Sequence, residues 1–388
     1  MERYFTLINR YKDRKIDRIW SEAYRFFLWE KIELLYLNNI LKEKGLIKDS
    51  LSPFGINTAF VKKYETETKH EMVAFLKELS LRMSIFEDSC PQVQKYLHYG
   101  LTSSDIIDTA FSIQLNESID YLLLNLNTLA TTTNSKIEDL KSLKAIGRTH
   151  GKHAEEIEFA DRFKLFNSEI AFCLEKLTNC KKNIYGKLQG PVGTSSFVFK
   201  DAAEKALHEL NLKQVPFGTQ VIPRFYYTDI MYALAMLASC YERFATFIRL
   251  SAIDEVNEIQ ENFSKGQAGS SAMPHKNNPV VSENICGLAR YIKSNFQVAL
   301  DNNNLWWERD ISHSSNERLI WPESFHLICN LTLKLNKLIN NLQINNSQIS
   351  QNLNNSNSLS HKELLESSLK SNRFEAYDQV KAKYHPRS

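Results

Sequence analysis

The sequence predicts an all-α fold, with a central bundle of long helices flanked by smaller helical N- and C-terminal segments. Two observations predict it: helix breakers are scarce, and three stripes of regularly spaced apolar residues occur along the chain. The 388 residues include only 12 glycines and nine prolines, and such scarcity favours long helices. In each stripe apolar residues recur at spacings of three and four, which is typical of a helix with one buried face. The stripes lie in segments of roughly 25 to 40 residues, longer than the usual globular helix, so side-by-side packing is expected. They are Leu115, Ile119, Leu122, Leu126 and Leu129; Phe163, Phe166, Ile170, Leu174 and Leu177; and Leu234, Leu237, Tyr241, Phe244 and Ile248.

The chain is expected to divide into three parts. Residues 1–104 form a helical N-terminal domain, residues 105–345 carry the long helices, and residues 346–388 form a short C-terminal helical segment. The run at 345–360 is rich in Asn and Ser and is expected to be a linker. One further short helix is expected over 361–384.

Composition excludes several classes of protein. The net charge is only +3 and no single-sign run stands out, which argues against nucleic acid as the main partner. The six cysteines are scattered without a CxxC pair, so neither a zinc site nor a disulfide framework is expected, and a reduced, cytoplasmic compartment fits best. The N-terminus lacks the apolar core of a signal peptide, and no run of about 18 apolar residues indicates a membrane span.

Polar residues gather in the breaks between the stripes, at 95–105, 145–156, 185–197 and 306–318. The helices carry the apolar residues, whereas the breaks carry side chains capable of chemistry. This division indicates a rigid scaffold that presents functional loops.

Residues 269–279 read GSSAMPHKNNP and are the most informative of these segments. Gly269 gives the backbone freedom and Pro274 breaks any helix, so a loop is predicted. A hydroxyl that must lose a proton needs a nearby cation or backbone N–H groups, and Lys276 and the amides around Gly269 are candidates for both. The alternative is a polar linker.

Three histidines lie in polar breaks or at a helix start, with Thr, Ser, Lys or Arg close by: His70, His98 and His150. Histidine titrates near neutrality and is the usual proton donor. Taken singly, each is better explained as a surface or capping residue, and it is the three together that indicate chemistry. His150 and His153 have the spacing of a metal-binding pair, but no third ligand at metal spacing is evident, so no metal site is expected.

The order Gly-Ser-x-x-Met-Pro-x-Lys-x-Asn, here Gly269 to Asn278, resembles the signature loop of the fumarase/aspartase superfamily. Four segments resemble one family of this superfamily, the adenylosuccinate lyases. They are HYGLTSSDIIDTA, GRTHG, KGQAGSSAMPHKNNP and ERDISHSSNER. His275 occupies the variable position before the lysine, as in many members of that family. The likeness runs from about Arg10 to the end of the chain.

This resemblance implies a carbon–nitrogen lyase of purine biosynthesis that needs no cofactor. The family cleaves adenylosuccinate to AMP and fumarate, and releases fumarate from the succinylated aminoimidazole carboxamide ribotide to leave AICAR. It does so by β-elimination, which needs a base, an acid and donors around a carboxylate. The implied assembly is a homotetramer in which each active site draws loops from three subunits, and the implied partner is a nucleotide substrate.

The roles of individual residues follow from the same resemblance. Ser270 is the expected base, His150 the general acid, and His70 and His98 support the acid or position substrate anions. Lys276 and Asn278 are expected to hold a carboxylate, and Thr102 and Ser103 an anion at a helix start. Arg309, Ser314, Ser315 and Arg318 are expected to grip the phosphate and ribose. The other expected substrate contacts are Arg10, Tyr11, Lys69, Glu71, Thr149, Gln220, Ser271 and Asn284.

The sequence also departs from the family pattern. Lys69-His70-Glu71 replaces Arg-His-Asp, the run 223–225 (Pro-Arg-Phe) replaces Gln-Arg-Asp, and Trp307 replaces a frequent histidine. Lysine cannot reproduce a bidentate arginine, so substrate grip is expected to differ. The chain is also expected to lack most of the family's small C-terminal helical domain. Two alternatives therefore stay open: another superfamily lyase with a different succinylated or amino-acid substrate, and a truncated nucleotide-binding homologue without activity.

Overall fold

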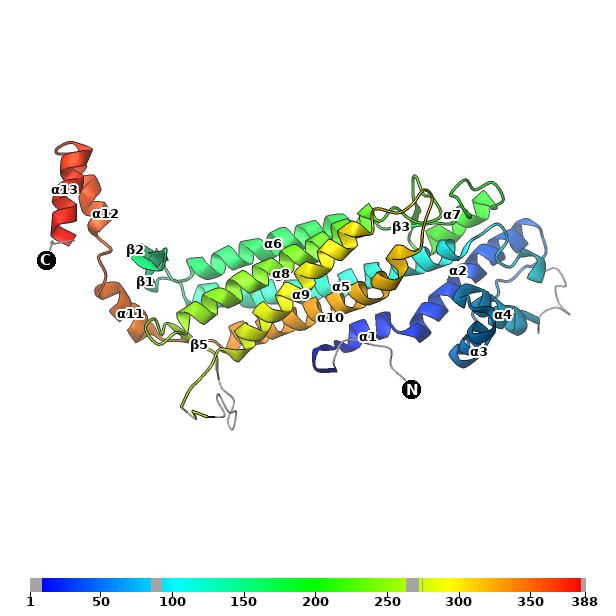
Figure 1. Cartoon of the computed structure of the whole chain (residues 1–388), viewed down its shortest axis with the longest axis horizontal. Helices are drawn as coiled ribbons and strands as arrows, with labels where there is room; N and C mark the ends of the chain where they lie inside the picture. The colour runs from blue at the N-terminus through cyan, green and yellow to red at the C-terminus, as the bar shows by residue number, and fades with distance from the viewer. Residues whose placement is uncertain (1–8, 85–92, 263–271, 274, 385–388) are drawn as a thin grey trace. The chain divides into compact units, whose positions relative to one another are not determined.

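The computed structural model describes residues 9–84, 93–262, 272–273 and 275–384, and it is mostly helical (Figure 1). Five long helices account for most of residues 103–341. They are α5 (Ser103–Asp139), α6 (Asp161–Lys181), α8 (Phe225–Ser251), α9 (Val280–Asp301) and α10 (Ser312–Asn341). The predicted all-α fold with a central bundle is confirmed.

The three apolar stripes explain why these helices pack. Every stripe residue is fully buried except Leu174, which is half-buried. Phe166 of α6 stacks on Phe244 of α8 with ring centroids 4.0 Å apart, and the hydroxyl of Tyr241 lies 2.7 Å from that of Thr332 on α10. Large aromatic side chains thus supply much of the buried area that holds the helices together.

The chain forms two compact units, and each of the five long helices contributes one part to each. The first unit comprises residues 1–125, 173–238 and 290–330, and the second comprises residues 126–172, 239–289 and 331–388.

The first unit contains most of the shorter N-terminal elements. These are η1 (Asn9–Tyr11), α1 (Arg14–Ile19), α2 (Glu22–Glu43), α3 (Thr58–Thr68), α4 (Glu71–Met83), η3 (Val93–Tyr96) and α7 (Lys200–Glu209), with a parallel pairing of β3 (Tyr185–Gly186) and β4 (Lys213–Gln214). Side-chain oxygens cap two of the helices: Asp13 accepts from Lys15 N and Ile16 N at the start of α1, and Ser21 accepts from Tyr24 N at the start of α2. Such caps satisfy amide groups that the helix itself leaves unpaired.

The second unit contains a hairpin where an irregular segment was expected at 145–156. Strands β1 (Lys144–Thr149) and β2 (Lys152–Glu158) pair antiparallel, with a register shift between Ile146 and Arg148. A second short pair, β5 (Ile259–Gln260) with β6 (Gln343–Ile344), also lies in this unit.

The linker expected at 345–360 is instead largely helical, because its polar residues make specific bonds. The segment contains α11 (Asn346–Asn354) and the start of α12 (Ser360–Ser368). Asn345 caps α11 by accepting from Gln348 N, and Asn352 donates to Val256 O at 2.9 Å and to Glu258 Oε1 at 3.0 Å.

The single short helix expected over 361–384 is two helices, α12 and α13 (Arg373–Tyr384). Asn372 lies between them and accepts from Phe374 N and Glu375 N. This asparagine therefore starts a new helix at the point where one continuous helix was predicted. Throughout the described residues, no helix is long and apolar enough to cross a membrane.

Candidate active site

His98 lies in a tight turn of the first unit, just before α5. Its φ is +55°, a conformation that non-glycine residues adopt at a cost. Its Nδ1 lies 2.5 Å from Oε1 of Glu33, a fully buried carboxylate on α2. Burial lowers the pKa of His98, but the charge and hydrogen bond of Glu33, aided by Asp105, outweigh it and raise that pKa above its ordinary value. The contact with Glu33 therefore favours the protonated form of His98.

The start of α5 is fixed by a buried ion pair. Asp105 and Lys187 are both fully buried, with Nζ and Oδ1 2.5 Å apart. The same carboxylate accepts from Gln189 N and Gly190 N at 3.0 Å, and from Thr102 N at 2.8 Å. The pair thus ties the expected anion-binding residues Thr102 and Ser103 to the loop at 187–190.

Glu71 and Arg318, two predicted substrate contacts far apart in the sequence, are brought together. Arg318 Nη2 donates to Glu71 Oε2 at 3.0 Å, and both oxygens of Glu71 also accept from Arg25 of α2. Burial raises the pKa of Glu71, but Arg25 and then Arg318 outweigh it, so that the pKa lies below its ordinary value. His70 caps α4, where its Nδ1 accepts from Val73 N, and both it and Lys69 are exposed.

Gln220 and Arg309 form a second predicted pair that the fold brings together. Arg309 Nη1 donates to Gln220 Oε1 at 2.8 Å. The Nε of Arg309 is buried and has no hydrogen-bond partner in the part of the chain that the structure describes. A buried donor without a partner is costly, so this atom is a candidate to receive a ligand oxygen.

Arg224 is part of a buried charge network. Its guanidinium donates to both oxygens of Asp108 at 2.7 and 3.1 Å and to Glu317 at 3.1 and 3.2 Å. Burial raises the pKa of Asp108, but Arg224 more than offsets this, so the pKa lies below its ordinary value. Arg224 therefore has a structural role within a run that departs from the family pattern. Trp307, another of the departures, is 91% exposed.

Arg10 and Tyr11 lie in η1, and Ser314 and Ser315 lie in the first turn of α10. Arg10 and Ser315 are exposed, whereas Tyr11 and Ser314 are half-buried.

His150 and Thr149 lie at the tip of the β1–β2 hairpin in the second unit, and both are exposed. Two residues before His150, Arg148 donates to Glu258 at 2.8 Å, and Arg162 of α6 donates to the other oxygen at 3.1 Å. Glu258 is fully buried. This carboxylate thus anchors the hairpin through Arg148.

The expected base, Ser270, and its neighbour Ser271 lie outside the described residues. Beyond them, Lys276 is exposed and Asn278 is half-buried, in non-helical backbone just before α9. Asn284, on α9, accepts from Lys334 Nζ at 2.5 Å. The described part of residues 272–279 agrees with the predicted loop.

Residues with left-handed backbone are concentrated in the segments predicted to carry functional residues. Eight described non-glycine residues have positive φ, and five lie in or beside those segments: Lys69, His98, His150, Ser195 and Trp307. Strained backbone tends to occur at functional sites because the surrounding structure must hold it there. This distribution supports the assignment of these segments to a site.

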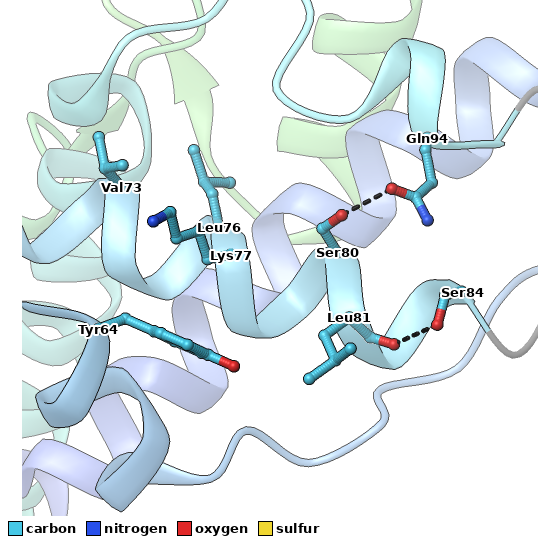
Figure 2. Close-up of a pocket in the computed structure, with 8 residues that line it drawn as sticks. All are labelled: Tyr64, Val73, Leu76, Lys77, Ser80, Leu81, Ser84 and Gln94. Atoms are coloured by element: carbon cyan, nitrogen blue, oxygen red, sulfur yellow. Dashed lines mark hydrogen bonds between the residues drawn. The ribbon is translucent and has the colours of Figure 1, made fainter. Parts of the chain in front are cut away.

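Two surface grooves lie elsewhere in the first unit. One, of about 590 Å³, lies along α4, where Ser80 donates to Gln94 (Figure 2). The other, of about 440 Å³, is lined by residues of α1, α2 and α5. Neither is lined by a predicted site residue, so neither bears on the predicted chemistry. The described residues also contain no group of three or more His, Cys, Asp or Glu placed to hold a metal ion.

The sequence did not predict the buried residues that hold the candidate segments of each unit in place. They are Glu33, Asp105, Asp108, Lys187 and Glu258, and each is nearly or fully buried. One signal was present: Asp105 and Asp108 are one turn apart on α5, beside the apolar residues Ile106 and Ala110. Charged residues on an apolar face are buried only when paired, which predicts cationic partners.

Comparison with known proteins places this chain in a family. A family model described as Lyase matches residues 38–293. The adenylosuccinate lyase of Bacillus subtilis is 35% identical over 389 residues, covering 97% of this chain and 88% of that protein. The adenylosuccinate lyases of Aquifex aeolicus and Thermotoga maritima are also each 35% identical, covering 89% of this chain and 80% of either protein. The chain belongs to the adenylosuccinate lyase family. The predicted resemblance is therefore confirmed, and the chain is a lyase of the fumarase/aspartase superfamily.

Solved structures agree on the fold of this family. A fumarate lyase from Mesorhizobium sp. BNC1 superposes with a TM-score of 0.83 at 19% identity, covering 97% of this chain and 88% of that one. A 3-carboxy-cis,cis-muconate lactonizing enzyme from Pseudomonas putida gives 0.82 at 19% identity, covering 96% and 85%. At this identity the likeness concerns the fold alone.

Proposed function

We propose that this protein cleaves adenylosuccinate to AMP and fumarate, and that it releases fumarate from the succinylated aminoimidazole carboxamide ribotide, as an enzyme of purine biosynthesis. The observation that carries the proposal is the 35% identity to adenylosuccinate lyases over 97% of the chain. Two contacts of the first unit support it: Thr102 N donates to the buried Asp105, and Arg309 donates to Gln220.

In the proposed reaction Ser270 removes a proton from the succinyl carbon next to a carboxylate. Negative charge develops on that carboxylate, where Lys276 and Asn278 stabilise it. His150 then protonates the nitrogen as the carbon–nitrogen bond breaks and fumarate leaves. His98, His70, Thr102, Ser103, Arg309 and Arg318 bind the substrate's anionic groups, and the remaining predicted contacts orient the nucleotide. No cofactor takes part.

The active enzyme is proposed to be a homotetramer in the cytoplasm, with each site completed by loops from three subunits. The exposed position of His150 at a hairpin tip supports this, because a general acid works best where water is excluded. A division into residues 1–104, 105–345 and 346–388 remains part of the same proposal. Neither nucleic acid nor a membrane is a proposed partner.

The test is the replacement of the proposed base. Ser270→Ala is expected to lower kcat for fumarate release by at least about 10²-fold, with an unchanged circular dichroism spectrum. Ser294→Ala is the matched control, because Ser294 is an exposed serine on α9 that bonds only to Tyr291 O among the described residues. Full activity in Ser270→Ala would remove this serine from the role.

The alternatives are separated by substrate. Wild-type protein is expected to release fumarate from adenylosuccinate and to leave argininosuccinate, aspartate and malate unchanged. Turnover of one of those compounds instead would indicate a different superfamily lyase, and binding of AMP without any turnover would indicate a non-catalytic homologue. The mass in solution, measured alongside, tests the tetramer.

A further inference from the structure

Two residues of α2 face the turn that carries His98. Glu33 and Tyr36 are one helical turn apart, and both are fully buried. Glu33 binds His98 Nδ1 at 2.5 Å. Tyr36 donates its hydroxyl proton to Tyr99 O at 3.0 Å and accepts from Phe199 N at 3.0 Å. One face of α2 therefore holds the turn at two consecutive residues.

The backbone of the turn at His98 is strained and needs contacts that hold it. His98 has φ of +55° and Gly100 has φ of +74°. A Cβ on Gly100 would lie 2.2 Å from Phe197 O, so the backbone of this turn lies directly against the 195–199 segment. A strained residue persists only where its surroundings over-determine its conformation, and here Glu33 supplies the contact to the imidazole itself.

Charge balance favours a protonated imidazole. The charged groups around His98 are Glu33 from α2, Asp105 from α5 and Lys187 from the loop after β3, and the neutral phenol of Tyr36 lies beside them. Two carboxylates and one ammonium leave one uncompensated negative charge unless His98 carries a proton. Oε2 of Glu33 is buried without a hydrogen-bond partner among the described residues, so His98 is the group that neutralises this carboxylate.

We propose that Glu33 is a positioning residue: it binds the Nδ1–H of His98, so that the Nε2–H group is the one presented to an anionic oxygen of the substrate. The proposal rests on the proposed function, because it assigns an anionic ligand to this side chain. His98 is then a fixed cation that binds substrate, and proton transfer is left to other groups. The raised pKa of His98 agrees with this arrangement.

The test is Glu33→Gln, which keeps the length of the side chain and an oxygen that can accept from Nδ1, but removes the charge. The titration of His98, followed by NMR of its ring nuclei, is expected to move about one unit or more toward lower pH. The limb of kcat/KM that falls at high pH should move in the same direction. KM for adenylosuccinate at neutral pH should rise about tenfold, with a smaller loss in kcat.

Glu30→Gln is the matched control. Glu30 lies on the same helix and is equally buried, but it accepts from Phe54 N at 2.6 Å and Gly55 N at 3.1 Å. This variant should leave the His98 titration unchanged. If Glu33→Gln does not fold, Glu33→Asp retains the charge at a greater distance from Nδ1 and should give a smaller shift in the same direction.

A His98 titration in Glu33→Gln that matches wild type would overturn the proposal, as would a shifted titration with unchanged KM and pH profile. Failure of the proposed function gives a different result. In that case wild-type protein releases no fumarate, whereas the NMR titration, which needs no substrate, still shows whether Glu33 controls His98.

Discussion

Single residues in the first unit show that charges at this site are buried in pairs. Asp105 and Lys187 lie fully buried at the start of α5, and the carboxylate receives three backbone amides besides the ammonium. Removing one partner of such a pair is costly because it leaves the other charge uncompensated. The pair therefore fixes the segment that carries Thr102 and Ser103.

Lys187→Met is expected to lower the free energy of unfolding by about 3 kcal/mol, measured by urea denaturation. Asp105→Asn should lower the free energy of unfolding by a similar amount, since it leaves the buried ammonium of Lys187 without a counter-charge. The double variant should cost less than the sum of the two single variants, because neither lone charge remains. Strictly additive costs would show that the two side chains do not depend on each other.

At this scale the sequence predicted candidate ligand contacts, but not the buried residues that hold those candidates in place. Glu71 and Arg318 were each predicted as substrate contacts, and the structure shows them bonded to each other. Glu33 was not predicted, because the pattern around it gives no sign that this carboxylate points inward. Its role depends on His98, which is 65 positions away, and no local pattern encodes such a contact.

Among the elements, the β1–β2 hairpin depends on a contact from outside itself. Arg148 of β1 and Arg162 of α6 share the buried Glu258, which also accepts from Asn352 of α11. Burial raises the pKa of Glu258, but Arg148, Asn352 and Arg162 together lower it by more. The pKa therefore lies below its ordinary value. The stability that this carboxylate contributes is therefore present above pH about 4.5 and is lost as the pH falls through the folded-state pKa.

Glu258→Gln is expected to lower the free energy of unfolding by about 3 kcal/mol and to speed amide hydrogen exchange in the hairpin. Glu261→Gln is the comparison, because Glu261 is also buried but accepts from Val281 N and Ser282 N at the start of α9. Equal exchange in the hairpins of both variants would contradict an anchoring role for Glu258.

Long helices were predictable where this hairpin was not. The stripes on α5, α6 and α8 repeat over many turns, so their burial could be read from spacing alone. Strand β2 is largely exposed, and only Ala145, Ile146 and Gly147 are buried in β1. Without an alternating apolar pattern, the hairpin forms through cross-strand pairing and through contacts with distant residues, which composition does not show.

At the scale of the whole molecule, protonation couples folding to pH through His326 of α10. Its Nδ1 accepts from Asp13 N at 3.0 Å, and the ring is fully buried. Burial lowers its pKa to about 4, although Asp17 and Asp13 act in the opposite direction. An unfolded chain takes up this proton near pH about 6.5, so stability is present above that value and falls as the pH is lowered toward 4.

His326→Asn, whose amide oxygen can still accept from Asp13 N, is expected to lack this dependence. Between pH 7 and pH 5 the wild-type protein should lose about 2 kcal/mol of unfolding free energy more than the variant does, measured by urea denaturation at both values. The difference between the two proteins isolates His326, since Glu30 and His98, whose pKa values are also shifted, are common to both. Parallel curves would show that His326 titrates normally.

The family of the whole chain was predictable from a few short motifs, because GSSAMPHKNNP and the motifs around His98 and His150 are specific. The three histidines lie on separate elements, with His70 and His98 in the first unit and His150 in the second. Which of them act together depends on tertiary and subunit packing, about which their spacing in the sequence says nothing.

The tryptophans of this chain make its intrinsic fluorescence a useful probe. Trp29 and Trp321 are buried among aromatic rings, whereas Trp306 and Trp307 are 73% and 91% exposed. Native emission therefore combines a blue, shielded component with a red component that aqueous iodide quenches. A ligand or partner that covers the loop between α9 and α10 will reduce iodide quenching of this red component. Intrinsic fluorescence can therefore follow its binding without an added label.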